Sequence, residues 1–258
     1  MEKIPDNERI RPEAYHARTG ETLLGHKSSV YRQLDKMQEY ANSHEMMINP
    51  GKTKFILFNT SRTHDFQPRY EINHKEIEIV DEIKLLGVII QSNMKWSANT
   101  LYITEKGFLR LWMLKRLKKN GSSWNDLKEV YEKQIRSVLE LAVPVWSPGL
   151  TQEDSNSIER VQKSALRIIL ESDYVSYEEA LHKMGLESLR SRREKLCLKF
   201  ALKSAKHEKF SAWFNPNNYA GPTTRSEKPN LKNIYANKVR YEKSPIPYLT
   251  SLLNNRNK

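Results

Sequence analysis

The 258-residue sequence has few of the residues that would point to a secreted, metal-binding or membrane protein. Its single cysteine, Cys197, cannot form an intramolecular disulfide and cannot supply a zinc finger, so an intracellular compartment, nucleus or cytoplasm, is expected. No apolar run approaches the roughly 20 residues of a membrane span, and the first residues lack an apolar signal core, so no membrane partner is expected. Nine glycines and eleven prolines, scattered along the chain, exclude repeat and low-complexity architectures.

Acidic residues are scarce only in the last third of the chain. Residues 1–182 contain 26 Lys and Arg against 26 Asp and Glu, whereas residues 183–258 contain 17 against 5, so the whole net charge of +12 lies there. A basic region of this kind is typical of a polyanion partner. RNA or DNA is favoured over an anionic membrane because no lipid-attachment motif or strongly amphipathic basic helix accompanies it. The alternative is a solvating tail that binds nothing.

The hydrophobic pattern predicts an α+β fold. Residues 1–27 are polar, show no sustained period and are expected to form a loop or arm. Ser28 or Ser29 can cap a helix that reaches Ala41. Short runs of strand-forming residues between positions 46 and 90 then predict a small antiparallel sheet.

From Tyr102 onward the apolar residues recur at helical spacing. Helices are predicted over residues 103–119 and 124–143, after the capping-box spacings at 151–154 and 176–179, and around residues 189–201. The prolines and asparagines that follow predict an extended tail. The predicted divisions are an arm at 1–27, a sheet-containing region at 28–97, a helical domain at 98–185, and a basic helix with a tail at 186–258.

Two motifs lie in the predicted sheet region. Residues 48–55 (Ile-Asn-Pro-Gly-Lys-Thr-Lys-Phe) have the form of a turn that presents a basic side chain, and residues 82–90 form a predicted strand that contains Gly87. Together and in this order they resemble the palm of non-LTR (LINE-type) retrotransposon reverse transcriptases, in which an Asn-x-x-Lys-Thr turn precedes the Leu-Gly-Val strand of the primer grip. Residues 135–140, 144–146 and 161–169 look like the thumb and following region, and residues 192–200 look like the end of such reading frames.

The resemblance implies an RNA-directed DNA polymerase fragment: a truncated palm remnant, a thumb-like domain and a basic C-terminal region that keep primer-template contacts. In the family, a Tyr-x-Asp-Asp hairpin holds Mg2+ and would lie just before residue 1. Here the seven aspartates include no adjacent pair, so no catalytic residue, metal ligand or cofactor is expected in this chain, and Mg2+ is expected only for the complete family enzyme. Two alternatives stay open: a non-catalytic basic nucleic-acid-binding module, and the C-terminal part of an active reverse transcriptase whose upstream exons are missing.

The candidate contacts to RNA and DNA are basic residues in three segments. The resemblance implies that Lys52 approaches a phosphate, while Asn49 fixes its turn. The charge pattern adds residues of the first thumb helix and of the last predicted helix: Lys115, Arg116, Lys118, Lys119, Arg192, Arg193, Lys195 and Lys199.

Aromatic residues near these cations have two interpretations. In the thumb helix, Phe108, Leu111 and Trp112 are expected to pack in the core rather than to stack on bases. In the tail, Trp213, Tyr219, Tyr235 and Tyr241 could stack on bases or pack against the thumb. The truncated palm sheet is also expected to leave an exposed edge through which the chain self-associates.

Overall fold

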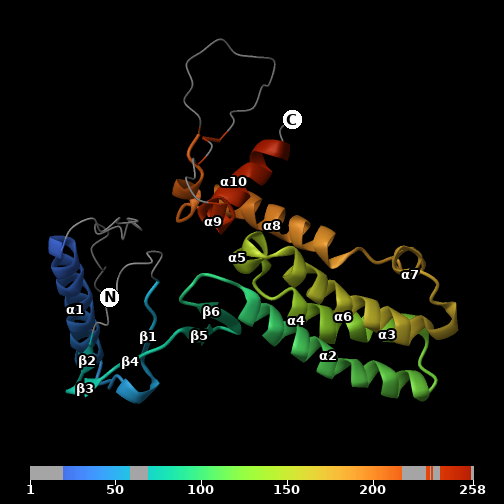
Figure 1. The fold of residues 1–258 in the computed structure, drawn as a ribbon, viewed down its shortest axis with the longest axis horizontal. Coiled ribbons are helices and arrows are strands. Elements are labelled where there is room, and N and C mark those ends of the chain that lie inside the picture. Colours follow the sequence, from blue (N-terminus) through green and yellow to red (C-terminus); the bar gives the residue numbers. More distant parts are fainter. Residues whose placement is uncertain (1–19, 59–68, 217–230, 233, 235–238, 257–258) are drawn as a thin grey trace, which may run out of the picture. The chain divides into compact units, whose positions relative to one another are not determined.

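The computed structural model describes residues 20–58, 69–216, 231, 232, 234 and 239–256, apart from the side chains of 20–29, 240 and 256. The chain divides into two compact units, Met1–Val80 and Asp81–Lys258, which are called the N-terminal unit and the helical unit below. Helices and short strand pairs occur together, which confirms the α+β class (Figure 1).

In its described residues, the N-terminal unit contains one α-helix and four two-residue strands. They are α1 (Gly20–Ser43), β1 (Lys54–Phe55), β2 (Glu71–Ile72), β3 (Lys75–Glu76) and β4 (Glu78–Ile79). Its buried cluster is small: Tyr70, Ile72 and Ile77, with Val30, Leu34, Ile48 and Phe55 packed against them. So small a core contributes little stability to the 51 described residues of this unit, because stability scales with the apolar area buried.

Helix α1 begins eight residues before the predicted cap at Ser28, so residues 20–27 are helical and the arm prediction was wrong for them. The glycine at position 25 was taken as a sign of a loop. Inside a helix, however, one glycine costs only about 1 kcal/mol relative to alanine, which the helix formers around it can offset. The rest of the predicted arm, residues 1–19, lies outside the described residues.

The strands of the N-terminal unit form separate pairs rather than one antiparallel sheet. β2 and β3 form an antiparallel hairpin around Asn73 and His74, which both have positive φ as a two-residue turn of this kind requires. β1 and β4 pair in parallel, with Lys54 opposite Glu78. Residues 46–48, predicted as a strand, belong to no strand.

The segment at residues 82–90 is a hairpin of β5 (Glu82–Leu85) and β6 (Val88–Gln91), so the prediction of a single strand was wrong. Leu86 and Gly87 form the turn, at φ of 49° and 89°. Leu86 is an apolar residue in a turn and is 91% exposed. Because it is apolar, the run of strand-forming residues in the sequence appeared to continue through the turn. A Cβ at Gly87 would lie 2.9 Å from the end of the Leu141 side chain, which can move aside, so the preference for glycine comes from its positive φ.

This hairpin belongs to the helical unit. The Asn99 side chain accepts a hydrogen bond from the Ile89 amide (3.1 Å), and the Gln91 side chain accepts one from the Ala98 amide (3.2 Å). Both bonds tie β6 to the first turn of the following helix. The division of the chain therefore falls after Val80, and not near residue 97.

The helices of the helical unit follow one another through short turns as far as α8. They are α2 (Ser97–Lys119), α3 (Trp124–Val130), a π-helical stretch (Tyr131–Arg136), α4 (Ser137–Leu139), α5 (Val143–Trp146), α6 (Gln152–Leu170), α7 (Tyr177–Met184), α8 (Leu189–Lys206), α9 (Val239–Glu242) and α10 (Pro245–Arg256). The capping box of Thr151 and Asp154 at the start of α6 is confirmed. So are the Ser176 cap of α7 and its end at Gly185.

Two proline positions were interpreted wrongly. The predicted helix at 124–143 is interrupted after Leu139, and Ala142 adopts φ of 51° before α5 starts with Pro144 in its first turn. Pro245 likewise starts α10 in the region predicted to be an extended tail. Proline suits the first turn of a helix because its missing N–H would have had no intrahelical partner there. In both places, proline marks a beginning and not an end.

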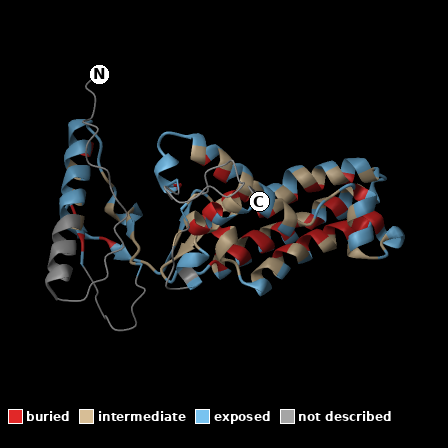
Figure 2. Ribbon diagram, turned by 90° about the horizontal axis from the view of Figure 1, so that it is seen from above, coloured by how far each residue is buried: buried red, intermediate tan, exposed pale blue. Residues whose placement is uncertain are grey.

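One buried cluster runs through the helical unit, shown in red in Figure 2. α6 lies at its centre and contacts both α2 and α8. α2 approaches α6 closely at Gly107, where a Cβ would lie 2.9 Å from Val161. Inside the cluster, Gln162 accepts a hydrogen bond from the Tyr131 hydroxyl (2.7 Å) and donates one to the Glu187 carbonyl (2.9 Å).

Candidate nucleic-acid interface

One face of α8 carries a row of exposed cations. Lys199, Lys203 and Lys206 are exposed and follow one another at spacings of four and three residues, so they project from the same side of the helix. Cys197 and Ala201, on the opposite side, are fully buried against the core. None of the three lysines has an ion-pair or hydrogen-bond partner in the described part of the chain.

The N-terminal half of α8 uses its cations internally. Arg192 forms a two-bond pair with Glu140, including a contact of 2.9 Å between its Nη2 and Oε2, and this carboxylate raises the pKa of Arg192. Lys195 pairs with Glu187 at the surface. Such an exposed pair contributes only about 0–1 kcal/mol and can be exchanged for another anion.

Arg193 does not lie on the basic face. It is buried, its Nη2 donates to the Ser155 hydroxyl at 2.6 Å, and burial lowers the pKa of its guanidinium. In a helix, adjacent residues are rotated by about 100°, so Arg193 points into the core while Arg192 stays at the edge of the basic face. The structure thus places Arg192, Lys195 and Lys199 on one face of α8 and separates Arg193 from them.

The C-terminal end of α2 forms a second basic surface. Lys115, Arg116 and Lys119 are exposed and have no ion-pair partner among the residues that the structure describes. Lys118 is engaged: its Nζ donates to the Ile169 carbonyl (3.0 Å) and lies 3.8 Å from the Glu171 carboxylate. Lys118 therefore connects the end of α2 to the end of α6.

Next to these cations, the outer face of α2 is aromatic. Leu111 is buried as predicted, but Phe108 is 45% exposed and Trp112 is 58% exposed, so the expectation that these two rings pack in the core was wrong. The reason lies in the helical phase, because the buried side of α2 is set by Ile103, Gly107, Leu111 and Leu114. Leu101 and Leu109 are exposed on the same outer face, and the sequence interpretation missed them. Their spacing from Phe108 and Trp112 was the available signal.

Asn49 and Lys52 lie in the N-terminal unit. The Asn49 side chain accepts a hydrogen bond from the Gly51 amide (3.0 Å) and caps a short 3-10 turn, Pro50–Lys52, as the motif suggested. Lys52 is exposed at the end of this turn. The structure supplies no acidic cluster around it that would form a reaction centre in the described residues.

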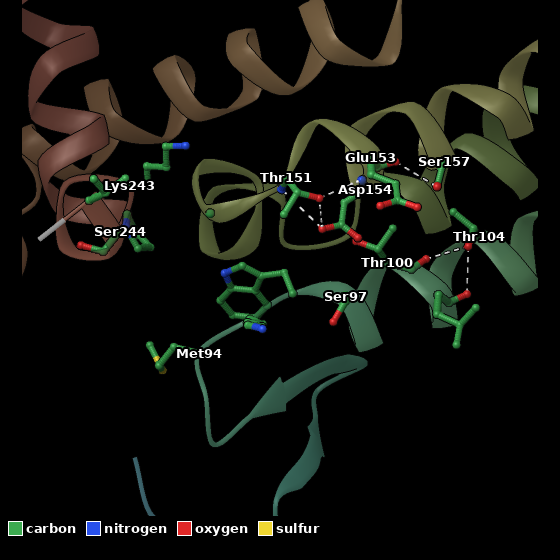
Figure 3. A pocket seen from close by; sticks show the side chains of 16 residues that line it. Met94, Ser97, Thr100, Thr104, Thr151, Glu153, Asp154, Ser157, Lys243 and Ser244 are labelled. Atoms are coloured by element: carbon green, nitrogen blue, oxygen red, sulfur yellow. Dashed lines mark hydrogen bonds between the residues drawn. The ribbon is translucent and has the colours of Figure 1, made fainter. Parts of the chain in front are cut away.

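A groove of about 700 Å³ opens in the helical unit beside the start of α6 (Figure 3). Several of its polar groups are engaged in local structure: Asp154 pairs with Thr151 in the capping box, and the Thr104 hydroxyl donates to the Thr100 carbonyl at 2.7 Å. The buried Thr100 hydroxyl itself has no hydrogen-bond partner in the described residues. Glu153 and Asp154 are there as residues of the first helical turn, where acidic side chains stabilise the helix dipole. Across the described ranges, no three His, Cys, Asp or Glu side chains gather as metal ligands.

In the tail, Trp213 and Tyr241 are at least partly exposed, whereas Tyr219 and Tyr235 lie outside the described residues. In the part of the chain that is described, no helix is long and apolar enough to span a bilayer. No family model, curated protein or solved structure matches this chain.

Proposed function

We propose that this chain is a nucleic-acid-binding protein, akin to the C-terminal part of a LINE-type reverse transcriptase, that holds RNA or DNA through its helical unit and does not polymerise by itself. The observation that carries the proposal is the row of lysines on α8. Lys199, Lys203 and Lys206 form one exposed face without intramolecular partners in the described residues, and such a face suits a phosphate backbone.

The distribution of charge between the units supports this. Residues 1–80 contain 12 basic and 12 acidic side chains, while residues 81–258 contain 31 and 19, so the helical unit carries the entire net charge of +12. Many of its cations are bound internally, as Arg193 and Lys118 show. The exposed cations on α8 and at the end of α2 lie at helical spacing on one face of each helix, and these two faces are therefore the expected contacts.

The proposed lack of polymerase activity follows from the chemistry of phosphoryl transfer. Two metal ions about 3.5–4 Å apart need clustered carboxylates to hold them on the attacking and leaving oxygens. The seven aspartates of the sequence include no adjacent pair. The acidic pair at Glu153 and Asp154 lies in a helix cap, where Asp154 is already engaged.

The test is a binding series with the full chain, using fluorescence anisotropy on labelled single-stranded RNA, single-stranded DNA and duplex over a range of salt. We expect binding with little sequence preference, and log affinity that falls with log salt by about 0.7 per phosphate neutralised on single strands. Template-directed primer extension with Mg2+ or Mn2+ is measured in parallel and is expected to be absent. Binding that is absent, or insensitive to salt, would contradict the proposed interface, and extension would contradict the non-catalytic assignment.

A further inference from the structure

The outer face of α2 changes character along its length. Leu101, Phe108 and Trp112 recur at helical spacing over its first four turns and are exposed, whereas Gly107 and Leu111 are buried. In the last two turns the same face continues with cations. These are Lys115, Arg116 and Lys119. The only acidic residue of α2 is Glu105, so the cations at the end of the helix have no acidic neighbour on their own element.

We infer that this face of α2 binds single-stranded nucleic acid, with bases stacked on Trp112 and Phe108 and the adjoining phosphates held by Lys115, Arg116 and Lys119. The inference rests on the proposed function and names the strand type and the contacts for one of its two surfaces. An exposed aromatic ring beside unpaired cations offers both parts of a single-strand site, the apolar face for the base and the charge for the backbone.

The spacing along the helix suits this arrangement. Phe108 and Trp112 are four residues apart, as are Trp112 and Arg116, and each step corresponds to about 6 Å along the helix axis. The rings therefore lie one turn apart on one face, with positive charge one turn further on. A strand that places its bases over the rings can place its phosphates beside the cations. Glu105, at the apolar end of the face, repels phosphate and so disfavours a strand whose phosphates lie at that end.

Charge distinguishes this occupant from a partner helix. An apolar stripe alone would suit an amphipathic helix, but three of the six residues named on this face are cations, and these cations have no acidic partner in the described residues. A single strand is favoured over a duplex because the bases of a duplex are already stacked on one another and show the protein only their edges and backbone.

The experiment compares the full chain with W112L, using labelled oligouridine as the single strand and a DNA duplex as the reference. Replacing an aromatic platform is expected to weaken single-strand binding by about 5- to 150-fold, and to leave duplex affinity and the salt slope unchanged. V145A is the matched control, since Val145 on α5 is also partly exposed but does not lie on this face. Intrinsic tryptophan fluorescence should be quenched by oligouridine in the wild type and in V145A, and much less in W112L.

A second variant separates charge from stacking. The triple change K115Q, R116Q and K119Q is expected to weaken both single-strand and duplex binding and to make the salt dependence shallower. If the wild type binds both ligands and W112L binds oligouridine as tightly as V145A does, the stacking inference is overturned while the proposed function stands. A wild type that binds neither ligand overturns both. If W112L differs from the wild type in its sedimentation coefficient but binds oligouridine equally well, the face is a contact between proteins. This result also overturns the inference.

Discussion

The two units of the chain differ in what holds them together and in what they offer to a partner. The N-terminal unit is neutral, with a described core cluster of three buried residues and with exposed methionines, whereas the helical unit carries the net charge and a cluster that runs from Val88 in β6 to Leu253 in α10. α8, which carries the basic face, buries Leu189, Cys197 and Ala201 in that cluster. The proposed binding surface is thus built on the better-packed unit, which fixes its geometry. Shortening the chain at Gly185 would remove part of the core together with the lysines.

The largest effect is expected from removing core volume in the helical unit. Leu127→Ala, at a fully buried position, should lower the free energy of unfolding by about 2–5 kcal/mol. All five tryptophans lie in this unit, so tryptophan fluorescence during urea unfolding reports on it alone. Ile72→Ala, a buried change in the N-terminal unit, should leave that transition in place. A shift of the tryptophan transition by Ile72→Ala as large as that by Leu127→Ala would show that the two units unfold together.

A smaller loss is expected from the buried polar bridge between α6 and its neighbours. Gln162→Leu leaves the buried Tyr131 hydroxyl without its partner, at a cost of about 1–3 kcal/mol. The partly buried Glu187 carbonyl also loses its donor but can bond to water instead. Gln152→Leu, on the exposed first turn of the same helix, is the control and should change stability by less than about 0.5 kcal/mol. Equal urea midpoints for the two variants would argue against the bridge.

The buried thiol should make the helical unit sensitive to alkaline pH. Burial raises the pKa of Cys197 from 9.0 to about 12, so the folded chain keeps a proton that the unfolded chain loses. The resulting stability is complete below pH 9.0 and is lost as pH rises toward about 12, by at most about 1.4 kcal/mol per pH unit. Between about pH 8 and about pH 10, urea unfolding should show a smaller loss for Cys197→Ala than for the wild type. Identical losses would place the thiol in contact with water.

The smallest effect concerns self-association of the N-terminal unit. Met37, Tyr40, Met46 and Met47 surround an open hollow there, and Met47 is 91% exposed. At tens of micromolar, on the order at which exposed apolar surface associates, the full chain should sediment partly as a dimer or larger species. Met46→Ser with Met47→Ser should reduce that fraction, while Leu86→Ser, equally exposed in the helical unit, should not. Monodisperse wild-type monomer would exclude association through this patch.

The sequence predicted features that depend on local chemistry. The capping box at Thr151 and the glycine end of α7 follow from the backbone groups that a helix leaves unpaired, and both were found at the expected residues. The helical period of the apolar residues also predicted α6. The Asn-Pro-Gly-Lys motif predicted the turn that Asn49 caps. These features need no knowledge of distant segments.

Features that depend on distant partners could not be predicted. Glu140 lies 52 residues from Arg192, so nothing near Arg192 in the sequence indicated that its charge is engaged. Trp112 was assigned to the core by its size and apolar character, although the phase of Gly107 and Leu111 turns it outward. The turn at Leu86 was missed for a similar reason, since Leu86 is apolar but exposed.

The central claim is that the position of the charge, and not its total, produces nucleic-acid binding. It is tested by two triple variants of equal net charge: Lys199→Gln, Lys203→Gln and Lys206→Gln on α8, and Arg32→Gln, Arg69→Gln and Lys75→Gln in the N-terminal unit. The slope of log affinity for single-stranded RNA against log salt should become shallower by about 2 for the α8 variant, since each lost phosphate contact is worth about 0.7. The N-terminal variant should retain the wild-type slope. Equal slopes for the two variants would contradict the claim.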